Sequence, residues 1–298
     1  MDIVYILIAF MTPILHGLAC ILDAHFSNNV FRRTSSLIFY ASITNAIIVP
    51  FLLFLGTPAI PSFHVFLVLG TIAAIDMLYL FPYYTALKRV DTSISVALFS
   101  LGKIAIPILA WFIVNERLHF IQYVGFGLIL LPSILLNLNL KKLKINSALY
   151  LMMFVSLILS LGTVLEKYSL ENESFLTVYF WIVIMTTVMA IAMLVIPAFR
   201  RDIKSEFVQY KKSVKLFIGQ EILSQLGTLA VLIALGHLPV LVQDAIESTQ
   251  AIFTLILGFV LYKIFGDQFR ENLTRQEVFK KMISFIFIIV GCILTVAG

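Results

Sequence analysis

Five ionisable residues stand inside long apolar runs of this 298-residue chain, where they can do chemistry only if they are kept away from lipid. They are Asp76, Lys103, Glu221, Asp244 and Glu247. A charged side chain at mid-bilayer costs about 2.5–3.5 kcal/mol on insertion scales. Facing lipid, the five together would cost on the order of 10 kcal/mol, which is comparable with the whole stability of a domain. We therefore expect them to line a watery cavity or to pair with one another.

The run 238–263 carries the most extended polar stripe of the chain. Gln243, Glu247, Gln250 and Thr254 recur three or four residues apart, and Asp244 widens the stripe. Residues at this spacing share one face of a helix, so we predict that this face binds a substrate. The alternative is that the start of the run is exposed at the water interface, because Pro239 opens it.

Two other runs present polar faces of the same kind. The predicted binding residues on them are Asp76, Tyr79 and Tyr83 in the run 63–87, and Glu221 and Gln225 in the run 214–236. Tyrosine rings can hold a cation by cation–π attraction. Rings at this spacing are also common packing residues, and both roles are open.

Lys103 and His16 are the candidate basic groups within the runs. Lys103 carries a compact charge on a long stem, which either binds a substrate carboxylate or forms a structural ion pair with Asp76 or Glu247. An unperturbed histidine titrates near neutral pH, so His16 and Glu247 are our candidates for proton coupling. The alternative for His16 is a core histidine bonded to a backbone carbonyl that Pro13 frees.

The elements that must position these residues are membrane-spanning helices. The chain is 61% hydrophobic and 12% charged, whereas a soluble domain is about a quarter charged. A helix crosses a bilayer with about 20 mostly apolar residues, and the runs of that kind are 3–23, 34–55, 63–87, 92–114, 119–139, 147–166, 175–198, 214–236, 238–263 and 280–297. We predict an all-α integral membrane protein with ten transmembrane helices. Asp23, Glu166 and Lys167 stand near the ends of runs, where we expect interfacial anchors.

The sequence repeats itself near its midpoint. Shifted by 148 residues, Thr85-Ala86-Leu87 falls on Ile233-Ala234-Leu235. Shifted by 143 residues, Ile21-Leu22-Asp23 falls on Val164-Leu165-Glu166. Because each half holds an odd number of runs, the second copy enters the membrane inverted, an arrangement that many transporters share. We predict one membrane domain made of two inverted five-helix repeats, 1–145 and 146–298.

The segment around the fourth run carries a recognisable pattern. It comprises Pro82-Tyr83-Tyr84-Thr85-Ala86-Leu87, the stretch 90–97, Pro107, Asn115-Glu116-Arg117-Leu118, Gln122, Gly125 and Gly127. This pattern resembles the EamA-like repeat of the drug/metabolite transporter superfamily. The resemblance implies a transporter fold and a metabolite substrate of unspecified kind. The second copy departs from the pattern, with Ile264 in place of the acidic residue.

Basic residues are unevenly distributed between the two sets of loops. Of the 21 Lys and Arg residues, 18 lie in the loops after the odd-numbered runs, and the exceptions are Lys103, Arg117 and Lys167. Cytoplasmic loops retain Lys and Arg, so we expect these loops in the cytoplasm and both termini outside an inner or plasma membrane. The resemblance implies termini in the cytoplasm, and the orientation is open.

The signatures of enzymes do not occur in the sequence. H-E-x-x-H, G-x-S-x-G and the Walker pattern are missing, and the five histidines lack the spacing of metal ligands. We therefore expect no enzymatic activity, cofactor or metal site, and transport driven by a gradient or by exchange. Basic charge spread over five short loops argues against nucleic-acid binding.

These patterns together predict a secondary transporter that works by alternating access. Its predicted substrate is a small amino-acid-like or amine-bearing metabolite, zwitterionic or cationic, because buried carboxylates outnumber Lys103. An exporter of hydrophobic organic cations is one alternative, and a membrane enzyme or receptor on a transporter-like scaffold is another. The direction of transport, the coupling ion and the oligomeric state are open.

Overall fold

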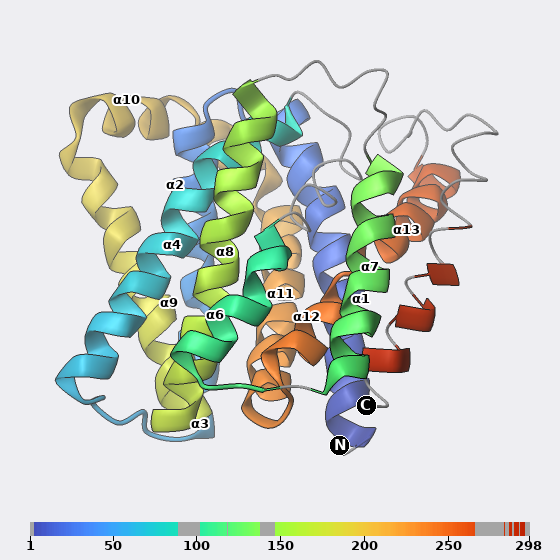
Figure 1. Ribbon diagram of the computed structural model, residues 1–298. Coiled ribbons are helices and arrows are strands. Elements are labelled where there is room, and N and C mark those ends of the chain that lie inside the picture. The colour runs from blue at the N-terminus through green and yellow to red at the C-terminus, as the bar shows by residue number, and fades with distance from the viewer. Residues whose placement is uncertain are drawn as a thin grey trace.

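The computed structural model describes residues 3–88, 102–117, 119–137 and 147–265, with scattered positions between 283 and 295. Within these residues every regular element is a helix, and the helices stand side by side as a bundle (Figure 1). The all-α prediction is confirmed for this part of the chain. The N-terminus lies at the end of the bundle opposite α10 (Pro197–Ser205), and we call these the N-terminal end and the α10 end (Figure 1).

Two serines fix the starts of long helices. The Ser62 hydroxyl accepts a hydrogen bond from the Val65 amide, and Ser174 accepts one from Thr177, which satisfies amides that the first turn leaves free. The first half contains α1 (Ile3–His25), the π-helical turn η1 (Phe26–Val30), α2 (Thr34–Asn45), η2 (Ala46–Ile48), α3 (Val49–Leu55), α4 (Phe63–Leu87), η3 (Gly102–Ala105), α6 (Ile106–Ile113) and α7 (Phe120–Asn137). The second half contains α8 (Ser147–Asn172), α9 (Phe175–Ala192), η4 (Met193–Val195), α10, α11 (Phe207–His237), α12 (Val240–Glu247) and α13 (Gln250–Phe265).

Helices long and apolar enough to cross a membrane number six in the described residues. Two shorter apolar helices, Gly102–Ile113 and Phe120–Leu130, fall within the predicted fourth and fifth spans, and α8 covers the sixth. The count of ten spans is therefore not confirmed. The start of the fourth span, the boundary between the predicted repeats and most of the tenth span lie outside the described residues.

The predicted ninth span is not one continuous helix. It breaks after Glu247, and α13 begins at Gln250. The Ser248 hydroxyl donates to the Asp244 carbonyl at 2.8 Å, and the Thr249 hydroxyl donates to the Ile246 carbonyl at 2.7 Å. Such side-chain bonds compete with the helical pattern of the backbone. The break divides the predicted polar stripe between two helices.

The two halves of the chain pack closely along α1, which runs beside α11 and α13. Contact is tight where glycines face side chains of the other half. A methyl group added at Gly227 would lie 2.3 Å from the His16 ring, and one at Gly17 would lie 3.1 Å from the Thr254 hydroxyl. On the other side of the bundle, α4 packs against α8 and α9. The first helix of each half, α1 or α8, thus contacts helices of the other half.

Two carboxylates join the halves at opposite ends of the bundle. At the N-terminal end, where Tyr5 stacks on His237, Glu116 accepts hydrogen bonds from the Val240 and Leu241 amides at 3.0 and 3.5 Å. Burial raises the pKa of the Glu116 carboxyl. At the α10 end, Glu206 accepts from the amides of two arginines, Arg32 at 2.7 Å and Arg33 at 3.2 Å. Glu116 thus caps the start of α12, and Glu206 holds the backbone just before α2, so each carboxylate bonds to the other half.

Candidate functional site

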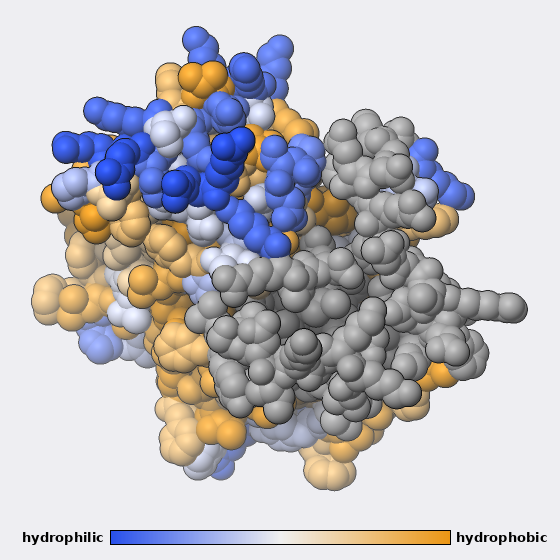
Figure 2. All heavy atoms as spheres, turned by 90° about the horizontal axis from the view of Figure 1, so that it is seen from above, coloured by the Kyte–Doolittle hydropathy of each residue, from blue (hydrophilic) through white to orange (hydrophobic). Residues whose placement is uncertain are grey.

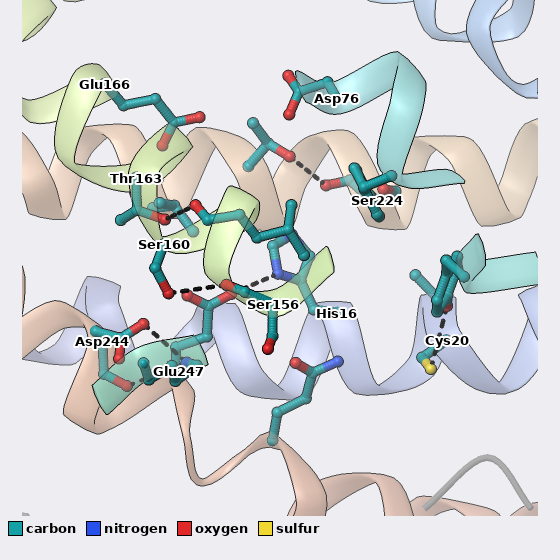
Figure 3. Close-up of a pocket in the computed structure, with 18 of the residues that line it drawn as sticks. His16, Cys20, Asp76, Ser156, Ser160, Thr163, Glu166, Ser224, Asp244 and Glu247 are labelled. Atoms are coloured by element: carbon teal, nitrogen blue, oxygen red, sulfur yellow. Dashed lines mark hydrogen bonds and ion pairs between the residues drawn. The ribbon is translucent and has the colours of Figure 1, made fainter. Parts of the chain in front are cut away.

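A cavity of about 260 Å³ lies in the middle of the bundle, between helices of both halves. Its walls come from α1, α4, η3, α8, α11, α12 and α13. The ionisable residues that line it are His16, Asp23, Asp76, Lys103, Glu166, Asp244 and Glu247, together with the phenols of Tyr79 and Tyr83. Figure 3 shows Asp76 and Glu166 toward one end of this central cavity and Asp244 and Glu247 toward the other.

Lys103 forms a buried ion pair at the end of the cavity near α12. Its Nζ lies 2.8 Å from Asp244 Oδ1, and the two side chains are 13% and 4% exposed. Lys103 Nζ also donates to the Asp244 carbonyl at 3.4 Å. Gly102 lets η3 come this close to α8, because an added methyl group would lie 2.0 Å from the Ser156 backbone. Lys103 thus forms a structural ion pair, but its partner is Asp244 rather than the predicted Asp76 or Glu247.

His16 and Glu247 form a second contact at the same end. The Nδ1 atom of His16 lies 3.2 Å from Glu247 Oε1, and Figure 3 shows the two side chains directed toward each other. Both side chains are about one-fifth exposed, at 22% and 21%. The two proton-coupling candidates are therefore adjacent, and His16 bonds to a carboxylate rather than to a backbone carbonyl freed by Pro13.

Asp23 lies at the other end of the cavity, held by groups from α4 and α11. The phenols of Tyr83 and Tyr84 donate to its oxygens at 3.0 and 3.3 Å, and the Gln220 amide donates at 3.0 Å. Asp23 is 9% exposed. The prediction of an interfacial anchor is wrong for Asp23, because α1 continues directly into η1 and the residue lies within the wall.

A second cavity of about 170 Å³ is contiguous with the first at this end. The cavities share Asp23, Asp76, Tyr79, Glu166, Ser224 and Thr228. Glu221 and Gln225 line the second cavity. Gln225 is fixed by its neighbours: its amide donates to Asn45 Oδ1 at 2.7 Å, and its carbonyl oxygen accepts from the Tyr179 phenol.

The predicted binding residues fall around these two cavities with one exception. The central cavity is lined by Asp76, Tyr79, Tyr83, Lys103, Asp244, Glu247 and Gln250, and the second by Glu221 and Gln225. Gln243 lies apart: it is fully buried, and among the described residues neither of its amide atoms has a hydrogen-bond partner. It is not among the described residues that line either cavity.

Two acidic lining residues, Asp23 and Glu166, were missed by reasoning from the sequence. Glu166 lines both cavities instead of anchoring a helix end, because α8 extends six residues beyond it to Asn172. Lys167 caps the end of α11, donating to the Leu235 carbonyl at 2.8 Å. The sequence did contain one sign that Asp23 and Glu166 have related positions: the shift of 143 residues aligns the two acidic residues.

Carboxylates dominate the charge of the site. Six of them line the two cavities: Asp23, Asp76, Glu166, Glu221, Asp244 and Glu247. The basic groups among the described lining residues, Lys103 and His16, both lie at the α12 end, where each contacts a carboxylate. The other end holds four carboxylates and no described basic side chain. Within the described residues no group of three His, Cys, Asp or Glu has the arrangement of a metal site.

Comparison with known families gives this cavity a context. The sequence pattern of the EamA-like transporter family matches residues 3–138, which supply α1, α4 and η3 to the site. Residues 3–138, just under half of the chain, thus match the EamA-like transporter family. This family is part of the drug/metabolite transporter superfamily, and the match suggests a membrane transporter of that type.

The fold also matches solved structures. One of them, titled only "Crystal structure of protein", aligns with 99% of this chain over 98% of its own length, with a TM-score of 0.69. The identity of the two sequences is 14%, so the likeness extends to the fold alone. None of the curated proteins compared with the chain matches it.

Proposed function

We propose that this EamA-like protein is a secondary transporter that moves a small amine-bearing metabolite, of the amino-acid type, by alternating access. The single observation that carries the proposal is the unequal distribution of charge in the cavities. One end holds Lys103 and His16, each beside a carboxylate, and the other holds four carboxylates without a described basic partner. A buried carboxylate is costly unless it is protonated or meets a positive charge, so the acidic end favours a cationic group.

An amine bound at the acidic end has several partners within reach. Asp76 and Glu166 line both cavities, and Glu221 lines the second. The Tyr79 and Tyr83 rings, with centroids 6.0 Å apart, stand beside them and provide faces for a cation. A carboxylate on the same ligand would then point toward Lys103 and His16. A zwitterion thus matches the direction of the charge across the site.

The same arrangement supports our proposal of alternating access and coupling. The cavity lies where helices of the two halves meet, which is where transporters with repeated halves bind their substrates. Adjacent His16 and Glu247 provide a place for a coupling proton. Exchange of one amine for another would use the same carboxylates. We propose an inner or plasma membrane, with the basic α10 end in the cytoplasm and both termini outside.

The rival function is export of hydrophobic organic cations, which the same acidic end would also favour. The two readings differ in what they require of Lys103. A zwitterion needs the Lys103 ammonium for its carboxylate, whereas a cation without a carboxylate does not. We expect the Lys103→Met variant, reconstituted in liposomes, to lose transport of amino acids. Retained transport of an organic cation in that variant, with no amino-acid transport by the wild type, would favour the rival.

The proposal is tested directly by ligand-dependent thermal unfolding of the purified protein. Paired compounds that differ in one group (an amino acid, its decarboxylated amine and its deaminated acid) would be compared on one protein. We expect the amino acid and the amine to stabilise, and the acid to have no effect. A ligand at 100 times its dissociation constant contributes about 2.7 kcal/mol to stability.

A variant and a matched control locate the effect in the acidic end. Glu221→Gln removes one carboxylate of the second cavity, and Glu171→Gln removes one carboxylate from an exposed position of α8. We expect the amine to lose at least tenfold in affinity for the first variant and less than twofold for the second. Stabilisation by the acid, or equal effects of the two variants, would contradict the proposed function.

A further inference from the structure

A third cavity lies outside the proposed transport site, at the α10 end of the bundle. Its volume is about 590 Å³, and it lies between the end of α1, the end of α4 and the first turns of α11. We call it the basic-end cavity. Three cations line it, Arg32, Lys88 and Lys212. No Asp or Glu is among the described residues of its lining.

The wall of the basic-end cavity is built by the π-helical turn η1. In this turn the Phe31 amide donates to the Phe26 carbonyl at 2.9 Å. The polar residues Ser27, Asn28 and Asn29 of the turn line the cavity. The Asn28 amide donates to the Leu87 carbonyl of α4 at 3.1 Å, and Ser27 donates to the Tyr84 carbonyl. Such π-turns are rare and often lie at functional sites. The cavity is thus held by side-chain bonds between two helices.

Two carboxylates beside the cavity, Glu206 and Asp202, are bonded to α2 and to the backbone just before it. Glu206 accepts hydrogen bonds from the Arg32 and Arg33 backbone amides. Asp202 accepts from the Ser35 hydroxyl at 3.0 Å and lies 4.0 Å from the Arg33 guanidinium. In the part of the chain that the structure describes, the side chains of Arg32, Lys88 and Lys212 form no ion pair. Lys88 donates instead to the Arg32 carbonyl at 3.0 Å.

The chemistry of the cavity matches a phosphate group. A guanidinium and two ammonium groups supply charge and donors, and side-chain amides and hydroxyls of Asn29, Gln209 and Ser213 add neutral donors. The cavity sits where the candidate spans Ile3–Val30 and Phe63–Leu87 end, and the ends of membrane spans meet the lipid headgroups. Phe207 and Val208, which precede the cavity residues of α11, are 55% and 57% exposed, as suits contact with acyl chains.

We propose that the basic-end cavity binds a phosphate group, carried by an anionic phospholipid headgroup or present as a free ion. Basic pockets between membrane helices on the cytoplasmic side bind such headgroups. Figure 2 shows hydrophilic side chains gathered on this end of the molecule, so attraction to anions in general must be separated from binding in the cavity. The site is distinct from the central cavity and does not depend on the transported substrate.

The experiment compares two double variants of the full chain with equal loss of charge. R32Q/K212Q changes two cavity residues and leaves the Arg32 backbone bond to Glu206 intact. R201Q/K211Q changes two exposed residues of the same end that are not in the described lining. Thermal unfolding would be measured at constant ionic strength with inorganic phosphate, in neutral phosphatidylcholine nanodiscs, and in nanodiscs that contain phosphatidylglycerol. If the double variant fails to fold, Lys212→Gln and Lys211→Gln, both at exposed positions, give the same comparison with one charge removed from each.

We expect a rise in melting temperature that saturates with the phosphate-bearing ligand. The half-saturating concentration should increase at least tenfold in R32Q/K212Q and less than twofold in R201Q/K211Q. Saturation with phosphatidylglycerol but not with inorganic phosphate identifies a headgroup, and saturation with inorganic phosphate identifies the free ion. Equal weakening in both double variants, or no stabilisation by either ligand, would overturn the proposal.

Discussion

Replacing Lys103 by methionine leaves the Asp244 carboxylate buried without its partner, and the consequence is large enough to measure. The two charged atoms are 2.8 Å apart, and Asp244 is 4% exposed at its side chain. Breaking a buried pair by removing one partner costs about 3–5 kcal/mol, because the remaining charge is uncompensated. At about 2–4 °C per kcal/mol for domains of 150–250 residues, the melting temperature should fall by roughly 6–20 °C.

The double variant K103M/D244N separates this cost from loss of packing. It removes both charges, so its stability should return to that of the wild type or exceed it, as seen when buried ion pairs are replaced by neutral groups. The coupling between the two sites in the double-mutant cycle should then be at least about 3 kcal/mol, at or above the upper end for residues in contact. Lys215→Met, which deletes a charge from an exposed position of α11, should change stability by less than about 0.5 kcal/mol.

The assay is thermal unfolding of the purified variants in one detergent, without substrate. A Lys103→Met variant that melts with the wild type would refute the reasoning. So would a double variant that is as unstable as the sum of the single changes, because the destabilisation would then come from the loss of the lysine stem. Adding an amine ligand to Lys103→Met should recover part of the lost stability, since the added cation compensates the carboxylates.

Three further predictions concern the contacts between the halves. Burial raises the pKa of Glu116 in the folded protein above its ordinary value of 4.5. The protonated carboxyl therefore contributes stability below pH 4.5, and this contribution is lost as the pH rises through the pKa of the folded state. The melting temperature of Glu116→Gln should therefore rise relative to that of the wild type between pH 4 and pH 7. A difference in melting temperature that stays constant with pH would contradict the raised pKa. Gly227→Ala should cost about 1–3 kcal/mol by overpacking the His16 ring, whereas Gly219→Ala, with open space at its methyl position, should not destabilise in the same melt. Glu247→Gln should reduce proton-dependent uptake into liposomes without abolishing binding of an amine, and undiminished uptake would remove the pair with His16 from the mechanism.

The polar faces could be predicted from sequence because an apolar background makes each buried charge conspicuous. Asp76, Lys103 and Glu247 stand many residues from any polar loop, and the cost of exposing them to lipid requires a cavity. Asp23 and Glu166 escaped the same argument, because the hydropathy of their runs falls just beyond them. Their helices continue into polar sequence, since α1 ends at His25 and α8 at Asn172. Hydropathy alone locates the apolar part of a helix and not its end.

The break between α12 and α13 had no conventional signal. Residues 240–250 contain neither Gly nor Pro, the residues that usually interrupt helices. At the interruption the hydroxyls of Ser248 and Thr249 bond to carbonyls of the preceding turn. Ser and Thr make such bonds in intact helices as well, so the residue types do not predict the break. The pairing of Lys103 with Asp244 was out of reach as well, because the two residues are 141 positions apart in the sequence.

The capping carboxylates give the proposed alternating access a physical constraint. Glu116 of the first half holds the start of α12 at one end, and Glu206 of the second half holds the backbone before α2 at the other. Opening an end by moving one half away from the other must transfer these backbone amides from a carboxylate to water. Exchanging a protein hydrogen bond for one to solvent changes the free energy by only about 0.5–1.5 kcal/mol, or by about 1.5–3 kcal/mol when a charged group takes part. Neither carboxylate therefore prevents the two halves from moving apart. The two caps therefore favour closure at both ends by similar amounts, and the substrate and the coupling ion in the central cavity are left to determine which end opens.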